Sequence, residues 1–562
     1  MRRIRWLRAG GVALLWVVAF AVGNHGIDFG HHWDEWYYTR TLERSVKNAT
    51  LVPGEYTYNS LYFEVGYALL VPQALGCLPG IASDIEAKPT RPLAVNDGVK
   101  YPHLDACRKA LVATIKSDDF LWRSRNVHLA LTCLAIVAVY LLVRRLAPGE
   151  PLAAFAAACV VALSFEVGTQ ARYVAVDGPM LACIAFAYVA AARAVQHPGV
   201  STTALVGAFA GLAVGWKLPA VVAVALVILV VAFAENVDRR RRVAMLAAGA
   251  GAFAAAFIVT TPGAVLDPLR FLGAQLHTKQ WYVTAPFAAY LTEPPVHVVR
   301  LMHWWLVAVP SSFPPLSVVL AALGVAGAVR ALRDRDVRRP FLVVAIFSAL
   351  WFTFLVSASP MVVHNALPLV PLLAASIGLG ASLSLRAARR YGRAPMFVVA
   401  VALATAAVAQ LAAVVAAART MSTTTAASIR RDAASWLTSH VDRPLYVSPF
   451  VRDAFTPLPS FAAVWRSDGT VSDGDVVVDD ARVAVRFDDH MHDWPANRPG
   501  FLEAVFGSRE ASYDYYPTWF GRWRHERIHV LSAANAKAMK IDVAKLIACA
   551  RVMTPSGTRS DP

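Results

Sequence analysis

The chain has 562 residues, of which 57% are hydrophobic and 16% are charged. Soluble domains average about 25% charged residues, so this composition and the repeated long apolar runs exclude an ordinary soluble domain. The formal net charge is +16, from 54 Lys and Arg against 38 Asp and Glu. The arginines fall in short clusters between apolar runs, which is typical of cytoplasmic loops and argues against nucleic-acid binding.

The N-terminal stretch MRRIRWLRAGGVALLWVVAFAVG places a basic segment before an apolar one. A secretory signal peptide has the same two features, but no small-residue cleavage site follows the apolar run cleanly. We therefore expect an uncleaved first helix with its N-terminus in the cytoplasm.

Apolar runs of about 17–25 residues are long enough to cross a bilayer. By this criterion the sequence predicts eleven spans, near residues 9–24, 126–143, 151–167, 176–193, 202–216, 218–234, 243–260, 311–329, 340–357, 364–384 and 395–417. Longer polar segments separate some of them, chiefly residues 24–125 and 261–310.

Arginine clusters set the predicted orientation. They lie at Arg2, Arg3, Arg5 and Arg8, at Arg144 and Arg145, at residues 239–242, at residues 330–339, and at residues 386–393. With the N-terminus inside, every cluster falls on the cytoplasmic side. The fold class expected is therefore mostly α, a polytopic membrane domain over residues 1–418 with a large outer loop at 24–125.

Residues 419–562 are expected to form a small α/β domain outside the cytoplasm. The segment IRRDAASWLTSHV has helical spacing of its apolar residues, while PLYVSPF and GDVVVDDARVAVRF have the β-branched character of strands. An odd number of spans places this domain on the outer, in bacteria periplasmic, side of the plasma membrane.

Two of the six cysteines, Cys77 and Cys107, fall in the first outer loop. Because the outer compartment is oxidising, we expect them to form a disulfide. Three others, Cys133, Cys159 and Cys183, lie in predicted spans, where a small apolar side chain explains them.

Charged side chains at membrane depth are costly, so each needs a partner or a function. On the predicted outer side they are Asp34 and Glu35 in HHWDEWYY, Arg172, Asp177, Lys217, Lys279 and His364. Helix capping or snorkelling is the plainer interpretation of Asp177 and Lys217 taken singly. Two adjacent acids exceed what one helix cap requires, so Asp34 and Glu35 are the stronger candidates.

Acids and bases at the outer membrane surface suit group transfer from a lipid-linked donor. A carboxylate can deprotonate an acceptor hydroxyl. Cations such as Arg172, Lys217 or Lys279 can hold a lipid phosphate and stabilise it as it leaves. These residues do not predict a cofactor. Asp34, Glu35, His31 and His32 are of types that bind divalent cations, so metal dependence stays an open question.

The order of RYVAVDGPMLACIAFAYVAAARA, GLAVGWKLPAVVAVAL, TPGAVLDPLRFL and HNALPLVPLLAA after the DE pair resembles the integral-membrane GT-C glycosyltransferases. The resemblance is to the protein O-mannosyltransferase and lipid A aminoarabinose transferase group and covers roughly residues 1–385. It implies inverting transfer of one sugar, mannose or a related one, from a polyprenyl-phosphate donor to a hydroxyl of a protein, lipid or glycan.

The resemblance also implies roles for single residues. Asp34 matches the family's base, with Glu35 beside it in support. The family's outer-face Arg and Asp match Arg172 and Asp177. Lys217 falls where relatives often carry a lysine, a position from which it could contact donor phosphate. Many relatives carry an Arg-Tyr pair where this chain has His364 and Asn365, so either His364 or Lys279 has to supply that cation.

Three other functions stay open on the sequence. A transporter or flippase of lipid-linked sugars explains the spans but not the large outer segments, and no internal repeat is evident. A glycan ligase or polymerase shares the donor chemistry but transfers a preassembled chain. A non-catalytic scaffold leaves the acid pair unexplained.

Overall fold

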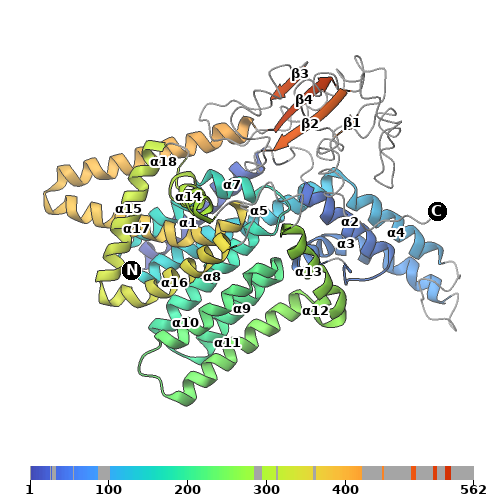
Figure 1. The fold of residues 1–562 in the computed structure, drawn as a ribbon, viewed down its shortest axis with the longest axis horizontal. Coiled ribbons are helices and arrows are strands. Elements are labelled where there is room, and N and C mark those ends of the chain that lie inside the picture. Colours follow the sequence, from blue (N-terminus) through green and yellow to red (C-terminus); the bar gives the residue numbers. More distant parts are fainter. Residues whose placement is uncertain are drawn as a thin grey trace.

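The structure, a computed structural model, describes residues 2–25, 27, 33–54, 56–86, 101–283, 294–311, 314–357 and 363–420, and four short strands between residues 446 and 532. Helices dominate it up to residue 420, and the strands follow (Figure 1). The fold class predicted from the sequence, a mostly helical polytopic membrane protein, is confirmed.

Each predicted span has a helical counterpart. These are α1 (Arg2–Asn24), α5 (Asp118–Leu146), α6 (Pro151–Ala162) with α7 (Phe165–Ala171), α8 (Asp177–Gln196), α9 (Val200–Trp216), η1 (Leu218–Val224) with α10 (Ala225–Phe233), α11 (Arg239–Thr260), α15 (Pro314–Arg333), α16 (Arg335–Ser357), η4 (Val363–Leu369) with α17 (Val370–Arg390), and α18 (Arg393–Thr420). By length and composition, eight helices of the described part can cross a membrane, or nine if the bent pair α6 and α7 is one span.

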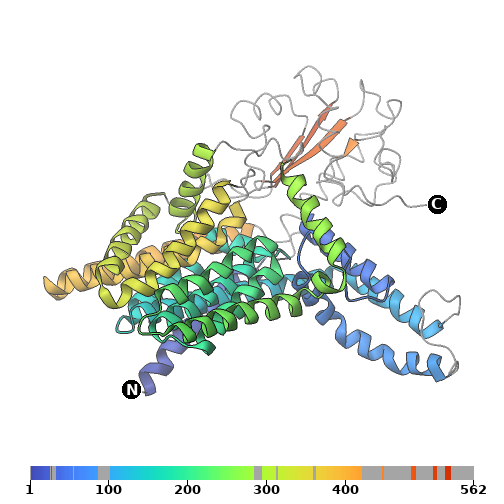
Figure 2. The ribbon, with the colours of Figure 1, turned by 60° about the horizontal axis from the view of Figure 1, so that its bottom comes forward.

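One of those eight helices was not predicted. The outer loop contains α2 (Trp33–Lys47), α3 (Leu61–Glu86) and α4 (Pro102–Ile115), and α3 is apolar enough to pass the same test. Cys77 on α3 and Cys107 on α4 form a disulfide that joins the two helices. The pair projects from the helical bundle (Figure 2). The second outer segment holds α12 (Gly263–Leu266), α13 (Pro268–Val283), α14 (Pro294–His303) and the π-helical turn η3 (Trp304–Ala308).

The centre of the bundle is built from α5 and α8. Small residues let these helices approach closely: a Cβ on Gly178 would lie 2.2 Å from Oγ1 of Thr132. Fifteen residues of α8 are buried, seven of them alanines, so this helix is covered on all sides. A helix that is apolar all round belongs inside a bundle rather than at its surface.

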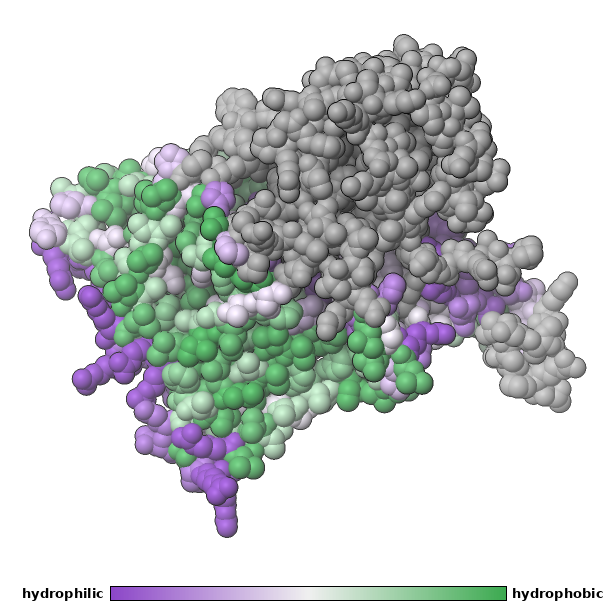
Figure 3. Space-filling view, in the orientation of Figure 1, coloured by the Kyte–Doolittle hydropathy of each residue, from purple (hydrophilic) through white to green (hydrophobic). Residues whose placement is uncertain are grey.

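Four arginine clusters meet at one end of the bundle. Glu150, between α5 and α6, binds Arg330 of α15, and Arg386 of α17 lies 3.1 Å from the same carboxylate. At this end Gln196 donates to the carbonyl of Arg145 at 2.7 Å, and Arg241 donates to that of Pro198 at 2.8 Å. Figure 3 shows hydrophilic residues at an edge of the molecule beside a broad hydrophobic belt. Four of the five clusters that the sequence assigned to one membrane side therefore share one end of the fold.

The strands form one four-stranded sheet in the order β1 (Tyr446–Val447), β2 (Arg482–Asp488), β4 (Glu526–Ser532) and β3 (Ala511–Asp514). β1 pairs with β2 in parallel, and the other two pairings are antiparallel, with Val485 opposite His529. β1 lies within the predicted segment PLYVSPF, and β2 overlaps the predicted segment GDVVVDDARVAVRF and ends one residue beyond it. The predicted helix at residues 429–441 lies outside the described residues.

Candidate functional site

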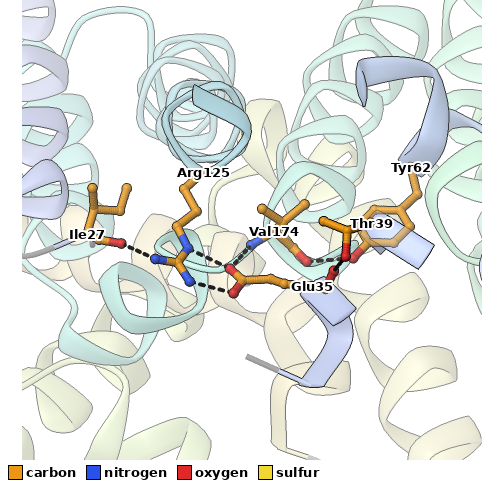
Figure 4. A network of polar contacts seen from close by, with 6 residues as sticks. All are labelled: Ile27, Glu35, Thr39, Tyr62, Arg125 and Val174. Atoms are coloured by element: carbon orange, nitrogen blue, oxygen red, sulfur yellow. Dashed lines mark hydrogen bonds and ion pairs between the residues drawn. The ribbon is translucent and has the colours of Figure 1, made fainter. Parts of the chain in front are cut away.

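Glu35 lies in a closed ion pair with Arg125. Its carboxylate accepts from Arg125 Nε at 2.7 Å and from Nη2 at 2.5 Å, and both side chains are at most 2% exposed. Arg125 Nη1 also donates to the carbonyl of Ile27 at 2.6 Å. A bidentate guanidinium-carboxylate pair fixes orientation as well as charge, and here it ties α5 to the start of α2 (Figure 4).

The same carboxylate anchors the loop before α8. Oε1 of Glu35 accepts from the backbone N–H of Val174 at 3.1 Å, and the carbonyl of Val174 accepts from the Tyr62 hydroxyl at 2.7 Å. Arg172 and Asp177 flank Val174 in this segment. The first turn of α2 is therefore held against the loop that leads into α8.

Aromatic rings pack beneath this ion pair. Tyr38 stacks on Phe120 with ring centroids 6.2 Å apart, and His128 meets the edge of Tyr62 at 5.9 Å and of Trp216 at 5.5 Å. Burial raises the pKa of Tyr38 well above its usual value, so the phenol stays neutral. These rings fill the space between α2, α3, α5 and α9 and leave Glu35 away from water.

A second group of polar side chains joins α8, α9 and η4. Lys217 Nζ donates to Oδ1 of Asp177 at 2.9 Å and to Oδ1 of Asn365 at 2.5 Å. His364 Nε2 lies 3.7 Å from Oδ2 of Asp177. Three of the sequence candidates, distant in the chain, are thus brought together in one cluster, the Asp177 cluster (Asp177, Lys217, His364 and Asn365).

Local sequence explains how these side chains reach one another. Lys217 has an extended backbone, φ −150° and ψ 125°, between the end of α9 and η1, and Pro219 in the first turn of η1 suits that break. Asp177 begins α8, where the helix dipole favours a negative charge. Trp351 Nε1 donates to the carbonyl of Asn365 at 3.0 Å and holds η4 in place. The capping interpretation of Asp177 and its ion pair with Lys217 are therefore compatible.

The cluster is less enclosed than the Glu35 pair. The side chain of Asp177 is 4% exposed, that of Lys217 10% and that of His364 18%. Exposure rises from the acid to the two nitrogen bases, so the basic side is the side that a ligand can approach. An anionic ligand suits such a surface.

For the remaining candidates, the structure gives the helix that carries them or a single contact. Asp34 lies in the first turn of α2 and Lys279 lies in α13. Arg172 follows α7, and its Nη2 donates to the carbonyl of Val22 at 2.9 Å, on the side of α1. Asp177 has Lys217 and His364 as its charged neighbours in the described part of the chain, so Arg172 is not a member of that cluster.

No group of three or more His, Cys, Asp or Glu residues suitable for a metal occurs among the residues that the structure describes. His31 and His32 lie outside those residues. Both carboxylate oxygens of Glu35 are engaged by Arg125 and one of them also by Val174.

Arg125 was not among the site residues predicted from the sequence, which placed it at the end of a loop. The helix in fact begins at Asp118, eight residues before the predicted span. A charged residue within one turn of a long apolar run was the available signal, because such a residue needs a partner at membrane depth.

Comparison with known proteins gives evidence on the class of enzyme. Residues 109–264 match the family described as dolichyl-phosphate-mannose-protein mannosyltransferase. This segment contains Arg125, Arg172, Asp177 and Lys217 and runs from α4 to α12. No curated protein matches the chain in sequence. The resemblance stated from the sequence is confirmed, and the match and the helical membrane fold indicate a glycosyltransferase of the GT-C type.

Two solved structures are similar over much of the chain. ArnT from Cupriavidus metallidurans bound to undecaprenyl phosphate shares 14% identity, with a TM-score of 0.48 over 94% of this chain and 99% of that chain. The archaeal oligosaccharyltransferase AglB from Archaeoglobus fulgidus, in complex with an inhibitory peptide and a dolichol-phosphate, shares 13% identity, with a TM-score of 0.43 over 78% of this chain and 58% of that chain. Both TM-scores are below 0.5, so neither structure places a ligand or a residue role in this chain.

Proposed function

We propose that this protein transfers a single sugar, mannose or a related one, from a polyprenyl-phosphate donor to a hydroxyl acceptor at the outer face of the membrane. The observation that supports this most is the hydrogen bond that the Val174 backbone N–H donates to the Glu35 carboxylate, because it joins two segments that carry different parts of the chemistry. Asp34 precedes Glu35 in the first turn of α2. Asp177, paired with Lys217, follows Val174 by three residues.

The proposed reaction is one inverting displacement. Asp34 accepts the proton of the acceptor hydroxyl, and the acceptor oxygen forms a bond to the anomeric carbon. The bond from that carbon to the donor phosphate oxygen breaks, and the phosphate leaves with the electron pair. No covalent sugar-enzyme intermediate is required, as in inverting glycosidases.

In this proposal the leaving phosphate is held by the basic side of the Asp177 cluster. Lys217 supplies a fixed ammonium charge, and His364 is the most exposed of the three titratable groups. Removing one preorganised hydrogen-bond donor from the position where negative charge develops costs about 3–4 kcal/mol in a hydrolase site. Asp177 keeps the Lys217 ammonium in place before the donor arrives. Lys279 on α13 is the alternative cation.

Glu35 takes a positioning role in this proposal. Its charge is neutralised by Arg125 in a site closed to water, so it is poorly suited to remove a proton from an acceptor. It holds α2 against the loop before α8, and thereby sets the position of Asp34.

The same proposal orients the protein. Four of the five arginine clusters share one end of the bundle, so we place that end in the cytoplasm and the Asp177 cluster outside, in a bacterial plasma membrane. Residues 1–418 then form the transferase domain and residues 419–562 an extracytoplasmic domain. The disulfide between Cys77 and Cys107 suits an oxidising outer compartment.

The test measures where the sugar of a labelled donor lipid is transferred. Purified protein in lipid vesicles is incubated with radiolabelled polyprenyl-phosphate mannose and separate hydroxyl acceptors: a Ser/Thr peptide, a lipid and a glycan. A labelled acceptor carrying one sugar, with release of polyprenyl phosphate, is the expected product. Unchanged donor that crosses the bilayer would instead identify a flippase, and an acceptor carrying several sugars would identify a ligase or polymerase.

A further inference from the structure

The turn that joins α17 to α18 carries four arginines. Arg386, Arg389 and Arg390 lie at the end of α17, and Arg393 begins α18. The sequence contains no Asp or Glu between residues 337 and 431. This turn lies at the left edge of the molecule in Figure 1. We call the four side chains the turn arginines.

The geometry of the turn brings these side chains together on one surface. All four turn arginines are exposed. Gly392 has φ +119°, a backbone conformation that other residues rarely adopt, and its N–H donates to the Arg389 carbonyl at 3.2 Å. The turn is therefore tight, and it places the end of α17 next to the start of α18.

Most of the positive charge of this surface is not neutralised within the protein. Arg386 lies 3.1 Å from the carboxylate of Glu150, but Arg330 binds the same carboxylate. The other three turn arginines form no ion pair in the part of the chain that the structure describes. The surface can therefore accept negative charge from a ligand.

Two other basic clusters at this end of the bundle have acids beside them. Asp238 caps α11 ahead of the arginines at residues 239–242. Asp334 and Asp336 flank the start of α16 within the cluster at residues 330–339. Of these three clusters, the turn between α17 and α18 is the one without an acid of its own.

Apolar side chains continue the surface directly beyond the turn arginines. On α18, Phe397 is 69% exposed, Val398 64% and Val401 45%, and Tyr391 in the turn is 84% exposed. Tyrosine is enriched at the depth of lipid headgroups, because its ring contacts lipid while its hydroxyl reaches water. The surface therefore combines a site for anionic groups with a wall for apolar chains.

We infer that the turn between α17 and α18 binds a phospholipid with two phosphates, of the cardiolipin class, whose acyl chains lie along α18. Guanidinium groups bind phosphate oxygens in a bidentate manner, and basic surfaces at the ends of membrane helices suit such headgroups. One phosphate would leave most of the charge of the turn arginines unbalanced, whereas two phosphates neutralise more of it. The exposed apolar side chains favour a lipid over a free phosphate.

This lipid site does not depend on the proposed transfer reaction. η4, which carries His364 and Asn365, directly precedes α17, and the turn follows that helix. A helix of this length spans about 30 Å, so the turn and the Asp177 cluster lie at opposite ends of the bundle. Lipid binding can therefore be measured without any sugar donor.

The test measures bound lipid by native mass spectrometry. The full-length protein in a neutral detergent is mixed with cardiolipin, with phosphatidylglycerol, which has one phosphate, or with phosphatidylcholine, which has no net charge. Wild-type protein is expected to bind one cardiolipin in preference to the other two lipids. Arg389→Gln combined with Arg390→Gln should weaken cardiolipin binding about 30-fold, since each arginine near an anionic headgroup contributes about fivefold.

The matched control is Arg239→Gln combined with Arg240→Gln. These two arginines are also adjacent and exposed at the basic end of the bundle, but they follow Asp238. Both double variants remove two positive charges, so a difference between them reports the position of the charge rather than the net charge. Exposed substitutions change stability little, so both variants should fold. The control should bind cardiolipin as the wild type does.

Three results would overturn the proposal. Unchanged cardiolipin binding in the variant of Arg389 and Arg390, or equal weakening in that variant and in the control, would overturn the site. Equal binding of cardiolipin and phosphatidylglycerol by the wild type would overturn the assignment of two phosphates. Displacement of cardiolipin by inorganic phosphate at the same concentration would show that the surface binds phosphate without lipid chains.

Discussion

Two acid-base groups at the same end of the bundle differ in how closed they are. Glu35 and Arg125 satisfy each other in a bidentate pair at most 2% exposed, whereas the Asp177 cluster leaves His364 18% exposed. Both cost free energy to bury, and each offsets that cost with partners. The difference teaches that a charge at membrane depth indicates function only when part of its group remains open to a ligand.

The largest expected effect is on the closed pair. Glu35→Gln leaves the Arg125 guanidinium buried without its counter-charge, which costs about 3–5 kcal/mol in comparable buried pairs. We expect a sharp loss of folded protein, measured as monodisperse yield in detergent and as a lower melting temperature. Glu35→Leu combined with Arg125→Met removes both charges and should recover part of that stability. Equal stability of Glu35→Gln and wild type would show that the pair does not hold α2.

The open cluster should respond in rate as well as in stability, because Lys217→Met also leaves the 4% exposed Asp177 carboxylate without its ammonium partner. Lys217→Met is expected to lower the rate of sugar transfer about 10²–10³-fold, because a preorganised charge at the leaving phosphate is lost. The measurement is the initial rate per folded molecule, with the melting temperature recorded alongside. Arg270→Met is the matched control, since Arg270 is a 67% exposed cation beside Asp267 on the outer side and should keep full activity. An unchanged rate in Lys217→Met would remove this cluster from the account.

The disulfide offers a smaller and more local test. Replacing Cys77 and Cys107 with Ser opens a loop with a sequence separation of 30, which corresponds to about 3–4 kcal/mol in the chain-entropy description. The loss should fall on α3 and α4, because these helices project from the bundle. Proteolysis of that hairpin should accelerate, while the rate of sugar transfer stays unchanged. A fall in transfer rate would connect the hairpin to the site.

The sequence predicted the membrane architecture well because apolar length and arginine position are local properties. It did not predict the pairing of Glu35 with Arg125, which are 90 residues apart, since tertiary packing rather than spacing brings them together. It placed Arg172 with Asp177 because they are close in the chain. The turn after α7 instead directs Arg172 toward α1, where it binds the Val22 carbonyl.

α3 shows a different reason for a missed element. Its sequence has an apolar run, but Pro72 and Pro79 lie within it, and prolines ordinarily weaken a helical prediction. Asp177, Lys217 and His364 were all identified singly from the cost of burying charge. Their contact could not be predicted, because it depends on how α8, α9 and η4 pack.

The smallest expected effect concerns a surface group on α2. Burial tends to raise the pKa of Glu43, but ion pairs with Lys47 at 2.7 Å and Lys116 at 3.0 Å outweigh it and lower that pKa. A lowered folded-state pKa gives stability that is present above the unfolded value, near pH 4.3, and is lost as the pH falls through the folded value. Both lysines are well exposed, so the contribution is at most about 0.5 kcal/mol. Melting temperatures of wild type and Glu43→Gln should converge as the pH falls below the lowered folded-state pKa, and a constant difference would contradict the pairing.

The central claim is that Asp34 is the base that accepts the acceptor proton. The direct measurement is the initial rate of sugar transfer by Asp34→Asn, with binding of the polyprenyl-phosphate sugar measured separately. Asp105→Asn, at a half-exposed acid on α4, serves as the control. We predict a loss of about 10²–10⁴-fold in rate with donor binding retained, as expected when a general base is removed. Full transfer by a folded Asp34→Asn protein would contradict the claim.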